Sequence, residues 1–515
     1  MSRAETEGRR GSRRQRLERK SGGLPQRPFK QLVYRYPPIE IISADEVEAI
    51  HEMGLTILEE VGMKVLSGPA RAAYRAAGFS VDEAEQRVRF DRAGAMGLVA
   101  HAPSSFLLTA RNPSKSIRMG DGHAVFCSVG GPAFSMDLEH GRRDGSFAAM
   151  QDFMKVVQSL DILHQEGGGG FEPLDLPPET RHLDIYLSCM RLLDKCWVPW
   201  TLGRAQTLDA IEMGAIVLGK SLEEMVETPM FSGIINTNSP LQLDVPMAEG
   251  LMTLAEYGQV NVVTPFTLAG AMAPVTLAGA LAQQHAEAIA GIALAQIVRK
   301  GVPVVYGGFT SNVDMKTGSP AFGTPEYTQA AQVSGQLARR LGLPYRSSNV
   351  TSANTTDAQA AYESQMALWG AMLGQANMIK HAAGWVGGGL TGSFEKLIID
   401  AEMLQMMAAW LEPFAVDDGT LALDAIKEVG PAGHYFGTKH TIARYETAFY
   451  QPLLSNWDNY DNWRERGQVT AEQRANQIWK ELVASYEQPP LDPAVDEALG
   501  DYAERRRREI TGRKP

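Results

Sequence analysis

The chain has 515 residues, of which 44% are hydrophobic and 21% are charged, and its formal net charge is −11. This length allows one large barrel with additions or about three average domains, and the composition is that of a compact globular protein rather than a disordered or fibrous one. The acidic balance argues against nucleic acid as the main partner, because proteins that bind phosphate backbones gather cations over their core.

The two ends of the chain are basic and have few apolar residues that could form a core. We predict a disordered basic tail over residues 1–36 and a second charged tail over residues 491–515, which contains Arg505 to Arg508. No apolar block follows the basic start, so a secretory signal is not expected. The three cysteines are too few and too scattered for a disulfide framework or a thiolate zinc site, and a reducing, cytoplasmic location is expected.

Residues 37–145 are expected to form a small α+β region. Apolar residues recur at helical spacing over 44–62, and the short runs "MKVL", "RVRF", "SFLLTAR" and "HAVFCSVGGPAF" indicate strands separated by turns.

Residues 146–430 alternate short apolar runs with long helical stretches. Seven such units begin at "DILHQEGG", "CWVPWTLG", "PMFSGIIN", "VNVVTPFTLAG", "VPVVYGGF", "YRSSNV" and "NMIKHAAGWVGG", and an eighth strand is expected from "LEPFAVDD" onwards. Continuous apolar strands that alternate with helices indicate a parallel sheet covered by helices. We therefore predict a TIM (β/α)8 barrel over 146–430, followed by a C-terminal helical extension over 431–490.

One stretch, "GAMAPVTLAGALAQQHAEAIAGIALAQ" at 270–296, is apolar enough to raise the question of a membrane span. Ala and Gly supply little hydrophobicity, and polar residues near its centre, including His285 and Glu287, would be costly in lipid. A helix covered by the rest of a soluble protein is predicted instead, with no membrane partner and with His285 and Glu287 in structural hydrogen bonds.

Catalytic groups of a TIM barrel lie at the carboxyl ends of its strands. The strand ends of this chain collect aromatic and neutral polar groups, which suits a small apolar or cationic molecule because ring faces attract quaternary ammonium. The predicted substrate-binding residues are Phe266, Tyr306, Phe309, Asn349, Trp385 and Gly388.

Two residues are candidates for catalysis. His381 precedes a Gly-rich loop and is predicted to act as a general acid or a hydrogen-bond donor, with a satisfied structural histidine as the alternative. Glu363 is the second candidate, and an ordinary supporting carboxylate near a helix start is its alternative. No metal site is predicted, because the H-x-x-x-H spacing is missing and the histidines are far apart in the sequence.

Several long segments resemble the trimethylamine methyltransferase superfamily, the corrinoid-dependent amine methyltransferases. They include "FSMDLEHGRRDGSFAAMQDF", "SPLQLDVPMAEGL", "AGAMAPVTLAGALAQQHAEAIAGIALAQIVRKGVPVVYGG", "DAQAAYESQMALWGAMLGQANMIKHAAGWVGGGLTGSFEKLIIDAEML" and "EVGPAGHYFGTKHT". The resemblance implies a TIM barrel that moves a methyl group from a tertiary or quaternary amine to the cobalt(I) of a corrinoid. It also implies that this chain binds no cofactor tightly, because a separate corrinoid protein presents the cobalamin.

Some members of this superfamily carry pyrrolysine within the barrel, whereas this chain has ordinary residues throughout. The resemblance therefore points to the branch that demethylates glycine betaine and related betaines. A betaine carboxylate would need a partner, for which His381 or the backbone amides of Gly387 to Gly389 are candidates.

Other functions remain open at this point. The donor could be trimethylamine or another tertiary amine, or the methyl group could pass directly to a folate. An unrelated barrel lyase acting on a small acid would need a Schiff-base lysine, and only Lys380 is well placed. Strand alternation predicts that one of Lys380 and His381 points out of the barrel. A non-catalytic assembly protein is a further alternative, and a homo-oligomer is expected in any case.

Overall fold

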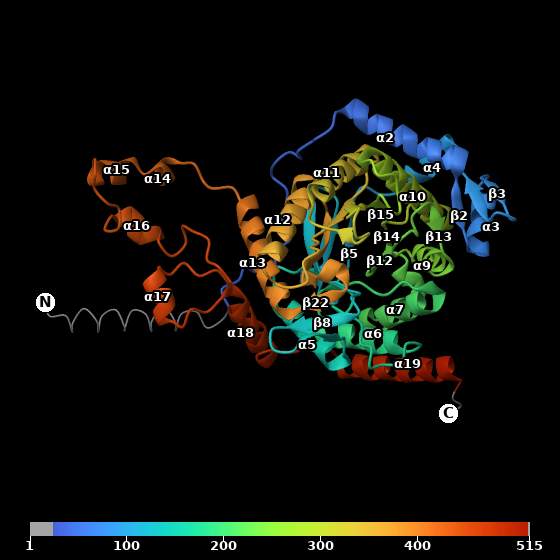
Figure 1. Ribbon diagram of the computed structural model, residues 1–515. Coiled ribbons are helices and arrows are strands. Elements are labelled where there is room, and N and C mark those ends of the chain that lie inside the picture. The colour runs from blue at the N-terminus through green and yellow to red at the C-terminus, as the bar shows by residue number, and fades with distance from the viewer. Residues whose placement is uncertain (1–23, 513–515) are drawn as a thin grey trace.

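The structure is a computed structural model that describes residues 24–512 (Figure 1). Most of the basic run predicted as an N-terminal tail lies outside the described residues. The centre of the molecule is a ring of parallel strands enclosed by helices, and this confirms the predicted TIM barrel.

The barrel has eight strands in chain order, and each pairs in parallel with the next except across one gap. They are β7 (His123–Ser128), β10 (Gln165–Glu166), β11 (Cys196–Trp197), β12 (Ser232–Ile235), β14 (Val260–Val263), β16 (Val304–Gly307), β19 (Tyr345–Ser348) and β20 (Met378–Ala383). The last strand returns to pair with the first. Two side-chain hydrogen bonds span the gap between β11 and β12: Gln165 Nε2 of β10 donates to Ser232 Oγ at 2.9 Å, and Thr201 Oγ1, after β11, donates to the Ile234 carbonyl at 3.0 Å. The ring is therefore nearly closed.

A long helix follows each strand and covers the outside of the ring. These helices are α5 (Phe147–Ser159), α6 (Arg181–Leu192), α7 (Gly203–Leu218), α9 (Val245–Glu256), α10 (Leu277–Val298), α11 (Pro325–Arg340), α12 (Ala358–Leu373) and α13 (Phe394–Leu411).

The predicted position of the eighth strand was wrong. Residues 411–418 form no strand, and the missing strand is β7, which lies before the predicted barrel boundary at residue 146. A β-hairpin of β8 (Phe134–Asp137) and β9 (Gly141–Asp144) separates β7 from α5. The sequence around β7 therefore reads as a series of short strands and lacks the strand-then-helix alternation of the other units.

The expected N-terminal α+β region is present on one side of the barrel (Figure 1). It contains α2 (Ala44–Thr56), a π-helix (Ile57–Val61), β2 (Met63–Val65), α3 (Gly68–Ala76), β3 (Ser80–Asp82), β4 (Arg87–Arg89) and α4 (Arg92–Val99). The small sheet is completed by β13 (Gln242–Leu243), which comes from the loop after β12. This region is thus joined to the barrel by strand pairing.

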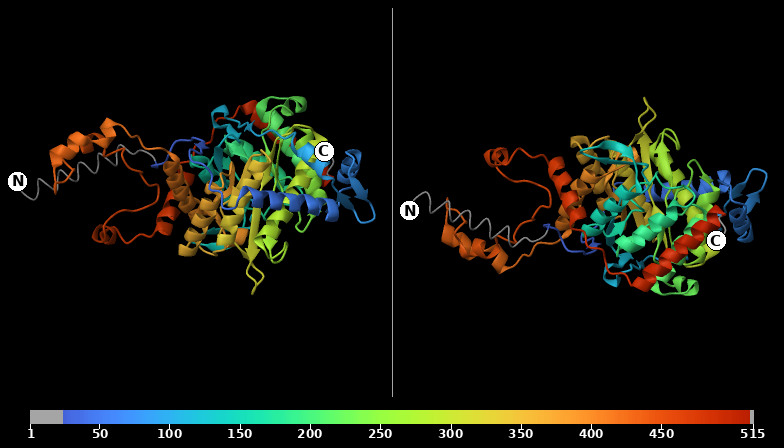
Figure 2. Two further views of the ribbon diagram at one scale, coloured as in Figure 1. Left: turned by 90° about the horizontal axis from the view of Figure 1, so that it is seen from above. Right: turned by 90° about the horizontal axis from the view of Figure 1, so that it is seen from below.

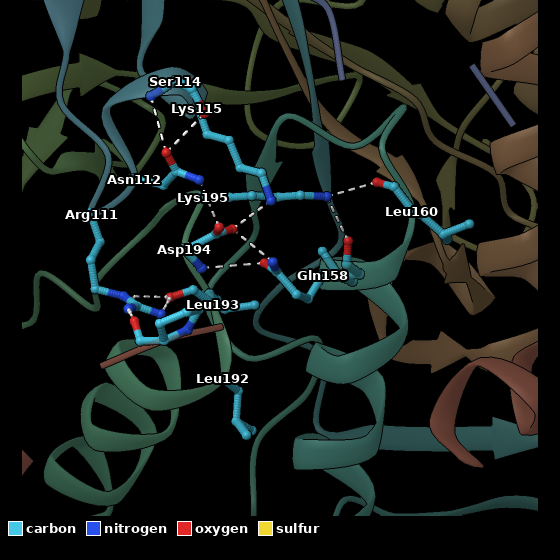
Figure 3. A network of polar contacts seen from close by, with 12 residues as sticks. Arg111, Asn112, Ser114, Lys115, Gln158, Leu160, Leu192, Leu193, Asp194 and Lys195 are labelled. Atoms are coloured by element: carbon cyan, nitrogen blue, oxygen red, sulfur yellow. Dashed lines mark hydrogen bonds and ion pairs between the residues drawn. The ribbon is translucent and has the colours of Figure 1, made fainter. Parts of the chain in front are cut away.

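A second hairpin, β5 (Phe106–Leu108) and β6 (Ile117–Met119), fills the base of the barrel. Its side chains pack with residues at the amino ends of the barrel strands, among them Val125, Val260 and Met378. A polar network holds it there (Figure 3): Asp194 accepts hydrogen bonds from Lys115 Nζ at 2.6 Å, Asn112 Nδ2 at 2.9 Å and Gln158 Nε2 at 2.7 Å. The base is therefore built for stability and leaves the opposite end for the site.

Both predicted tails contain ordered structure. Residues 32–33 form β1 (Leu32–Val33), which pairs antiparallel with β7. Residues 493–511 form α19 (Pro493–Thr511), which packs on α6 and α7. The prediction of a solvated C-terminal tail was wrong because its cations have partners: Arg506 pairs with Asp209 and Arg507 with Asp184, each at 2.7 Å.

Residues 270–296, the stretch considered as a membrane span, form most of α10, and every residue from Ala280 to Gln296 is buried. Helices α2, α4, α9 and α11 cover it. Nowhere in residues 24–512 does a helix combine the length and the apolar character that a bilayer crossing requires.

Two small sheets stand at the carboxyl ends of the barrel strands. One contains β15 (Phe266–Ala269), β17 (Phe309–Val313) and β18 (Pro320–Ala321), and the other contains β8, β9, β21 (Trp385–Val386) and β22 (Thr391–Ser393). The chain then leaves the body after α13 and returns as α18 (Ala471–Ala484), which packs on α13 and α5. The expected C-terminal helical extension is thus present, and Figure 2 shows part of it reaching away from the barrel.

Candidate active site

A cavity of about 460 Å³ lies at the carboxyl ends of the barrel strands, where a TIM barrel carries its chemistry. Every strand of the ring supplies a wall residue, either from the strand itself or from the loop after it. These residues include Gly130, Gly167, Val198, Asn236, Thr264, Phe309, Arg346 and Lys380.

One wall of the cavity is aromatic. The ring centres of Phe266 and Phe309 lie 5.1 Å apart, and the Trp385 ring lies 6.2 Å from Phe309. Trp200 also lines the cavity, and its indole Nε1 donates to the Gly168 carbonyl at 3.2 Å. Three of the predicted substrate-binding residues, Phe266, Phe309 and Trp385, thus share one surface, and Trp200 adds a fourth ring.

The neighbours Lys380 and His381 both line the cavity, although strand alternation predicted that one of them would point outwards. The register between β20 and β7 shifts between Ile379 and Ala383, and His381 has φ +51°. A bulge of this kind adds a residue and redirects the side chains beside it. The alternation argument was therefore wrong at this position.

His381 is held in its neutral form. Burial, together with the nearby charges of Arg346 and Lys380, keeps the pKa of the imidazole well below its usual range. Its Nδ1 lies 3.2 Å from Ser348 Oγ, and its ring centre lies 4.4 Å from that of Trp385. A neutral imidazole can orient a ligand through a hydrogen bond, but it is a poor proton donor, which weakens the predicted role as a general acid.

Arg346 is a buried cation in the wall of the cavity. It comes from β19, and its side chain is 2% exposed. Within residues 24–512 its Nε and Nη1 have no hydrogen-bond partner, and no carboxylate pairs with it. The guanidinium carbon lies 5.1 Å from the ring centre of Phe309, and burial lowers the pKa of Arg346 to about 10. An unpaired buried charge is costly, so this guanidinium is suited to receive an anionic group of a ligand.

The second cation of the cavity, Lys380, is anchored to the loop after β10. Its Nζ donates to the Gly167 carbonyl at 2.8 Å. The buried carboxylate of Glu166 accepts from the backbone amides of Gly168 and Gly169 at 2.7 and 2.8 Å, and burial raises its pKa. Lys380 and Glu166 therefore fix the glycine loop after β10 that forms the cavity wall.

The other predicted substrate-binding residues are not among those that line the cavity. Tyr306 points into the helix layer, where its hydroxyl lies 3.0 Å from His285 Nδ1 and 3.3 Å from Gln284 Nε2. Asn349 donates through Nδ2 to the Ala382 carbonyl at 2.9 Å. Gly388 binds the Thr351 carbonyl through its amide, whereas the next residue, Gly389, reaches the cavity.

Glu363 also lies outside the cavity, where it supports the loop after β19. Its carboxylate accepts from Thr351 Oγ1 at 2.5 Å and from the amides of Ser352 and Ala353 at 2.8 and 3.1 Å. This position matches the alternative reading of a supporting carboxylate.

The sequence predictions missed Arg346 as a wall residue, whereas Trp200 and Asn236 stand at predicted strand ends and Lys380 was considered only as a Schiff-base lysine. A usable signal was present for Arg346, because "YRSSNV" places a charge within an otherwise buried parallel strand. Charged residues are almost never fully buried without a purpose or a partner.

His285 and Glu287 have the predicted structural roles. His285 Nε2 lies 2.8 Å from His51 Nδ1, and Glu287 accepts from Ser239 Oγ at 2.7 Å and the Leu241 amide at 2.8 Å. On α2, outside the cavity, one possible metal-ligand atom from each of Glu48, His51 and Glu52 lies within 4.8 Å of the other two.

Known proteins match this chain over most of its length. Residues 8–511 match the sequence profile of the family described as trimethylamine methyltransferase (MTTB). The monomethylamine methyltransferase (MtmB) of Methanosarcina barkeri superposes with a TM-score of 0.44 at 9% identity, over 86% of this chain and 93% of that one.

Curated relatives match over nearly their whole length. Glycine betaine methyltransferase of Desulfitobacterium hafniense (strain Y51) is 35% identical over 475 residues, which cover 92% of this chain and 98% of the relative. Trimethylamine methyltransferase MttB of Desulfitobacterium hafniense (strain DSM 10664 / DCB-2) is 28% identical over 90% of this chain and 93% of its own. MttB2 of Methanosarcina mazei is 25% identical over 91% and 96%. The chain therefore belongs to the trimethylamine methyltransferase (MTTB) family and is a methyltransferase.

Proposed function

We propose that the chain transfers a methyl group from a betaine, a quaternary ammonium compound that also carries a carboxylate, to the corrinoid of a separate protein. The observation that carries the choice of donor is Arg346, a buried guanidinium without a protein partner in residues 24–512 that faces an aromatic cavity. The 35% identity to a glycine betaine methyltransferase supports the same choice.

The cavity offers separate places for the two ends of a betaine. The carboxylate pairs with Arg346, since guanidinium and carboxylate form strong, geometrically matched hydrogen bonds. The trimethylammonium group lies against the rings of Phe266, Phe309 and Trp385, whose faces attract a desolvated cation. This arrangement replaces the sequence prediction that His381 or the amides of Gly387 to Gly389 bind the carboxylate.

The protonation state of the site also favours a quaternary donor. In-line displacement breaks one C–N bond, and the electron pair of that bond stays on nitrogen. A quaternary ammonium therefore leaves as a neutral tertiary amine and needs no proton, whereas a tertiary amine would need one. His381 is neutral, so it contributes orientation and exclusion of water rather than a proton.

The corrinoid, when it is bound, supplies the nucleophile that accepts the methyl group. The loops that follow the barrel strands expose apolar side chains that would contact the protein that carries the corrinoid: Leu202, Val245, Val275, Met315 and Leu390. These residues would surround the entrance to the cavity, while Trp385 and Arg346 hold the donor below it.

A donor panel tests the carboxylate requirement. Purified chain, reduced corrinoid protein and glycine betaine are expected to give dimethylglycine and a change in corrinoid absorbance. Choline has the same quaternary ammonium without a carboxylate, and trimethylamine lacks both the quaternary nitrogen and the carboxylate, so both are expected to react at least about 100-fold more slowly. Equal or faster turnover of choline or trimethylamine would show that the carboxylate is not recognised.

A second arm of the experiment tests the acceptor. Tetrahydrofolate without corrinoid protein is expected to give no dimethylglycine. Product formed under those conditions would assign direct transfer to folate, and release of a cleaved small acid with no methyl transfer would assign a lyase instead.

A further inference from the structure

The segment between α13 and α18 forms an arm whose four helices stand away from the barrel. Its Leu453 and Leu454 contact the body: both are buried, and their amides donate to Glu402 of α13 at 2.7 and 2.8 Å. This arm, residues 412–468, contains α14 (Asp418–Leu421), α15 (Leu423–Val429), α16 (Lys439–Arg444) and α17 (Tyr460–Glu465). Figures 1 and 2 show the four helices beside the body rather than on it, in all three views. A connection of this length without a core of its own is uncommon in a compact domain and is usually functional.

The arm is unusually apolar for a surface segment. Thirty large hydrophobic side chains of residues 24–512 are exposed, and twelve of them fall between residues 414 and 460. Phe414 is 86% exposed, Phe436 85% and Phe449 79%. Scattered single apolar residues are normal on a surface, but a concentration of this kind marks a contact with another molecule.

The body carries a second exposed apolar face next to the root of the arm. Tyr362 and Met366 lie one turn apart on α12, and Met406 and Trp410 lie one turn apart on α13. The rings of Tyr36 and Trp369 lie 5.3 and 5.1 Å from Trp410 and join the two helices into one surface. We call this surface, Tyr36, Tyr362, Met366, Trp369, Met406 and Trp410, the α12/α13 face.

We propose that the arm packs on the α12/α13 face of a second copy of this chain, and that the exchange is reciprocal. Within residues 24–512, each chain carries both halves of such an interface, an arm with exposed apolar side chains and an exposed apolar face. The arm leaves the body at Leu411, directly after Trp410. A two-fold axis close to the α12/α13 face therefore brings each arm onto the face of the other copy, which is the arrangement of a closed, self-complementary dimer.

The available area fits a stable dimer. The arm exposes seven aromatic side chains, and a large aromatic residue contributes about 150–250 Å² when buried. These rings alone present an area on the order of the roughly 800 Å² per partner of a standard stable interface. An unrelated partner would explain the arm but would leave the matching α12/α13 face without a role.

Measurement of mass in solution tests the proposal. The full chain is expected to be a dimer, or a larger assembly built from it, by light scattering and sedimentation across a micromolar dilution series. The arm variant Phe414→Ser/Phe436→Ser/Phe449→Ser is expected to weaken association about 100-fold or more, because buried aromatic anchors dominate interfaces. The matched control Met53→Ser/Val61→Ser/Leu107→Ser removes three exposed apolar side chains from the N-terminal region and base, and it is expected to associate as the unaltered chain does.

A mixing experiment tests reciprocity. The face variant Met366→Asp/Met406→Asp is expected to lose association as the arm variant does. Circular dichroism should show that both variants fold, because the five side chains replaced in the two variants are exposed. An equimolar mixture retains one intact arm and one intact face, so it is expected to form heterodimers that neither variant forms alone. A monomeric full chain, or variants that keep its mass, would overturn the proposal, and a mixture that stays monomeric would overturn the reciprocal exchange.

Discussion

Glu363 and Trp385 are linked through a single residue, Thr351, although Glu363 does not reach the cavity. The Thr351 hydroxyl donates to the Glu363 carboxylate at 2.5 Å, and the Thr351 carbonyl accepts from Trp385 Nε1 at 3.0 Å. The same carboxylate binds the next two backbone amides of the loop. Glu363 is therefore a positioning residue for the indole that lines the site.

Replacement of Glu363 tests this linkage. Glu363→Gln removes the charge that orders the loop, and charge-assisted hydrogen bonds contribute roughly 1.5–3 kcal/mol, so kcat/KM for the betaine is expected to fall about tenfold to a hundredfold. The loss should appear mainly in KM, because Trp385 contacts the bound donor, while the melting temperature changes little. Gln359 binds the same carboxylate from the solvent side, and Gln359→Ala serves as the control with expected unchanged kinetics. A fall in kcat alone would argue against positioning through Trp385.

Arg346 gives a prediction in which activity and stability move in opposite directions. Arg346→Met is expected to reduce kcat/KM for glycine betaine by about 10² to 10³, since a carboxylate bound in a buried site would lose its partner. The same change removes an unpaired buried charge and is expected to raise the free energy of unfolding of the substrate-free protein by roughly 1–3 kcal/mol. Arg346→Lys keeps a charge but loses the two-pronged geometry, and an intermediate loss is expected. A variant that is both inactive and destabilised would indicate that Arg346 supports the fold.

The fold was largely predictable because seven of the eight barrel strands lie in short runs that each precede a long helix. The pattern failed at β7, where the β8–β9 hairpin intervenes before α5. It failed again at α19, whose arginines are neutralised by Asp184 and Asp209, residues distant in the sequence. Pairing between distant elements has no local signature, so basic helices of this kind look like tails.

The candidate site was predictable only in part. Phe266, Phe309 and Trp385 stand at strand ends and were found from that position alone. Strand alternation wrongly predicted that one of Lys380 and His381 points outwards, because a bulge at His381 overrides the alternation. Tyr306 was wrongly placed at the cavity because an aromatic side chain at the end of a strand can point to either layer, and its bond to His285 depends on packing between β16 and α10.

The neutral state of His381 gives a prediction for activity. His381→Gln can keep a hydrogen bond toward Ser348, so kcat/KM is expected to fall less than about tenfold, whereas loss of a general acid costs about 10² to 10⁴. The profile of kcat/KM between pH 6 and pH 8 is expected to be the same shape in both proteins. A bell or step in the pH profile of the unaltered chain that is missing from the profile of His381→Gln would show that His381 transfers a proton.

His381 also predicts how stability depends on acid. Its folded pKa lies below the unfolded value, so below about pH 6.5 the unfolded chain takes up a proton that the folded chain does not. The stability contribution of the neutral ring is therefore present above that pH and is lost as the pH falls, at up to about 1.4 kcal/mol per pH unit. Denaturant unfolding from pH 7 to pH 5 is expected to show a shallower decline for His381→Gln. Parallel declines would mean that the ring accepts a proton while the protein stays folded.

Lys195 at the base of the barrel gives the corresponding prediction at alkaline pH. Its side chain is 1% exposed, its Nζ donates to the carbonyls of Val157 and Leu160 at 3.0 and 2.8 Å (Figure 3), and burial lowers its pKa to about 7. Between pH 7 and the usual lysine value of about 10.4, the unfolded chain holds a proton that the folded chain has released, so this residue makes stability rise with pH.

Lys195→Met removes that contribution. The stability difference between the unaltered chain and Lys195→Met is therefore expected to shift in favour of the unaltered chain by up to about 1.4 kcal/mol per unit as the pH is raised from 7 to 9. Lys155→Met, which removes a partly exposed lysine from α5, the helix whose end binds Lys195, is the matched control for loss of charge. A constant difference between the unaltered chain and Lys195→Met across this range would show that Lys195 remains charged in the folded protein, held by the two carbonyls.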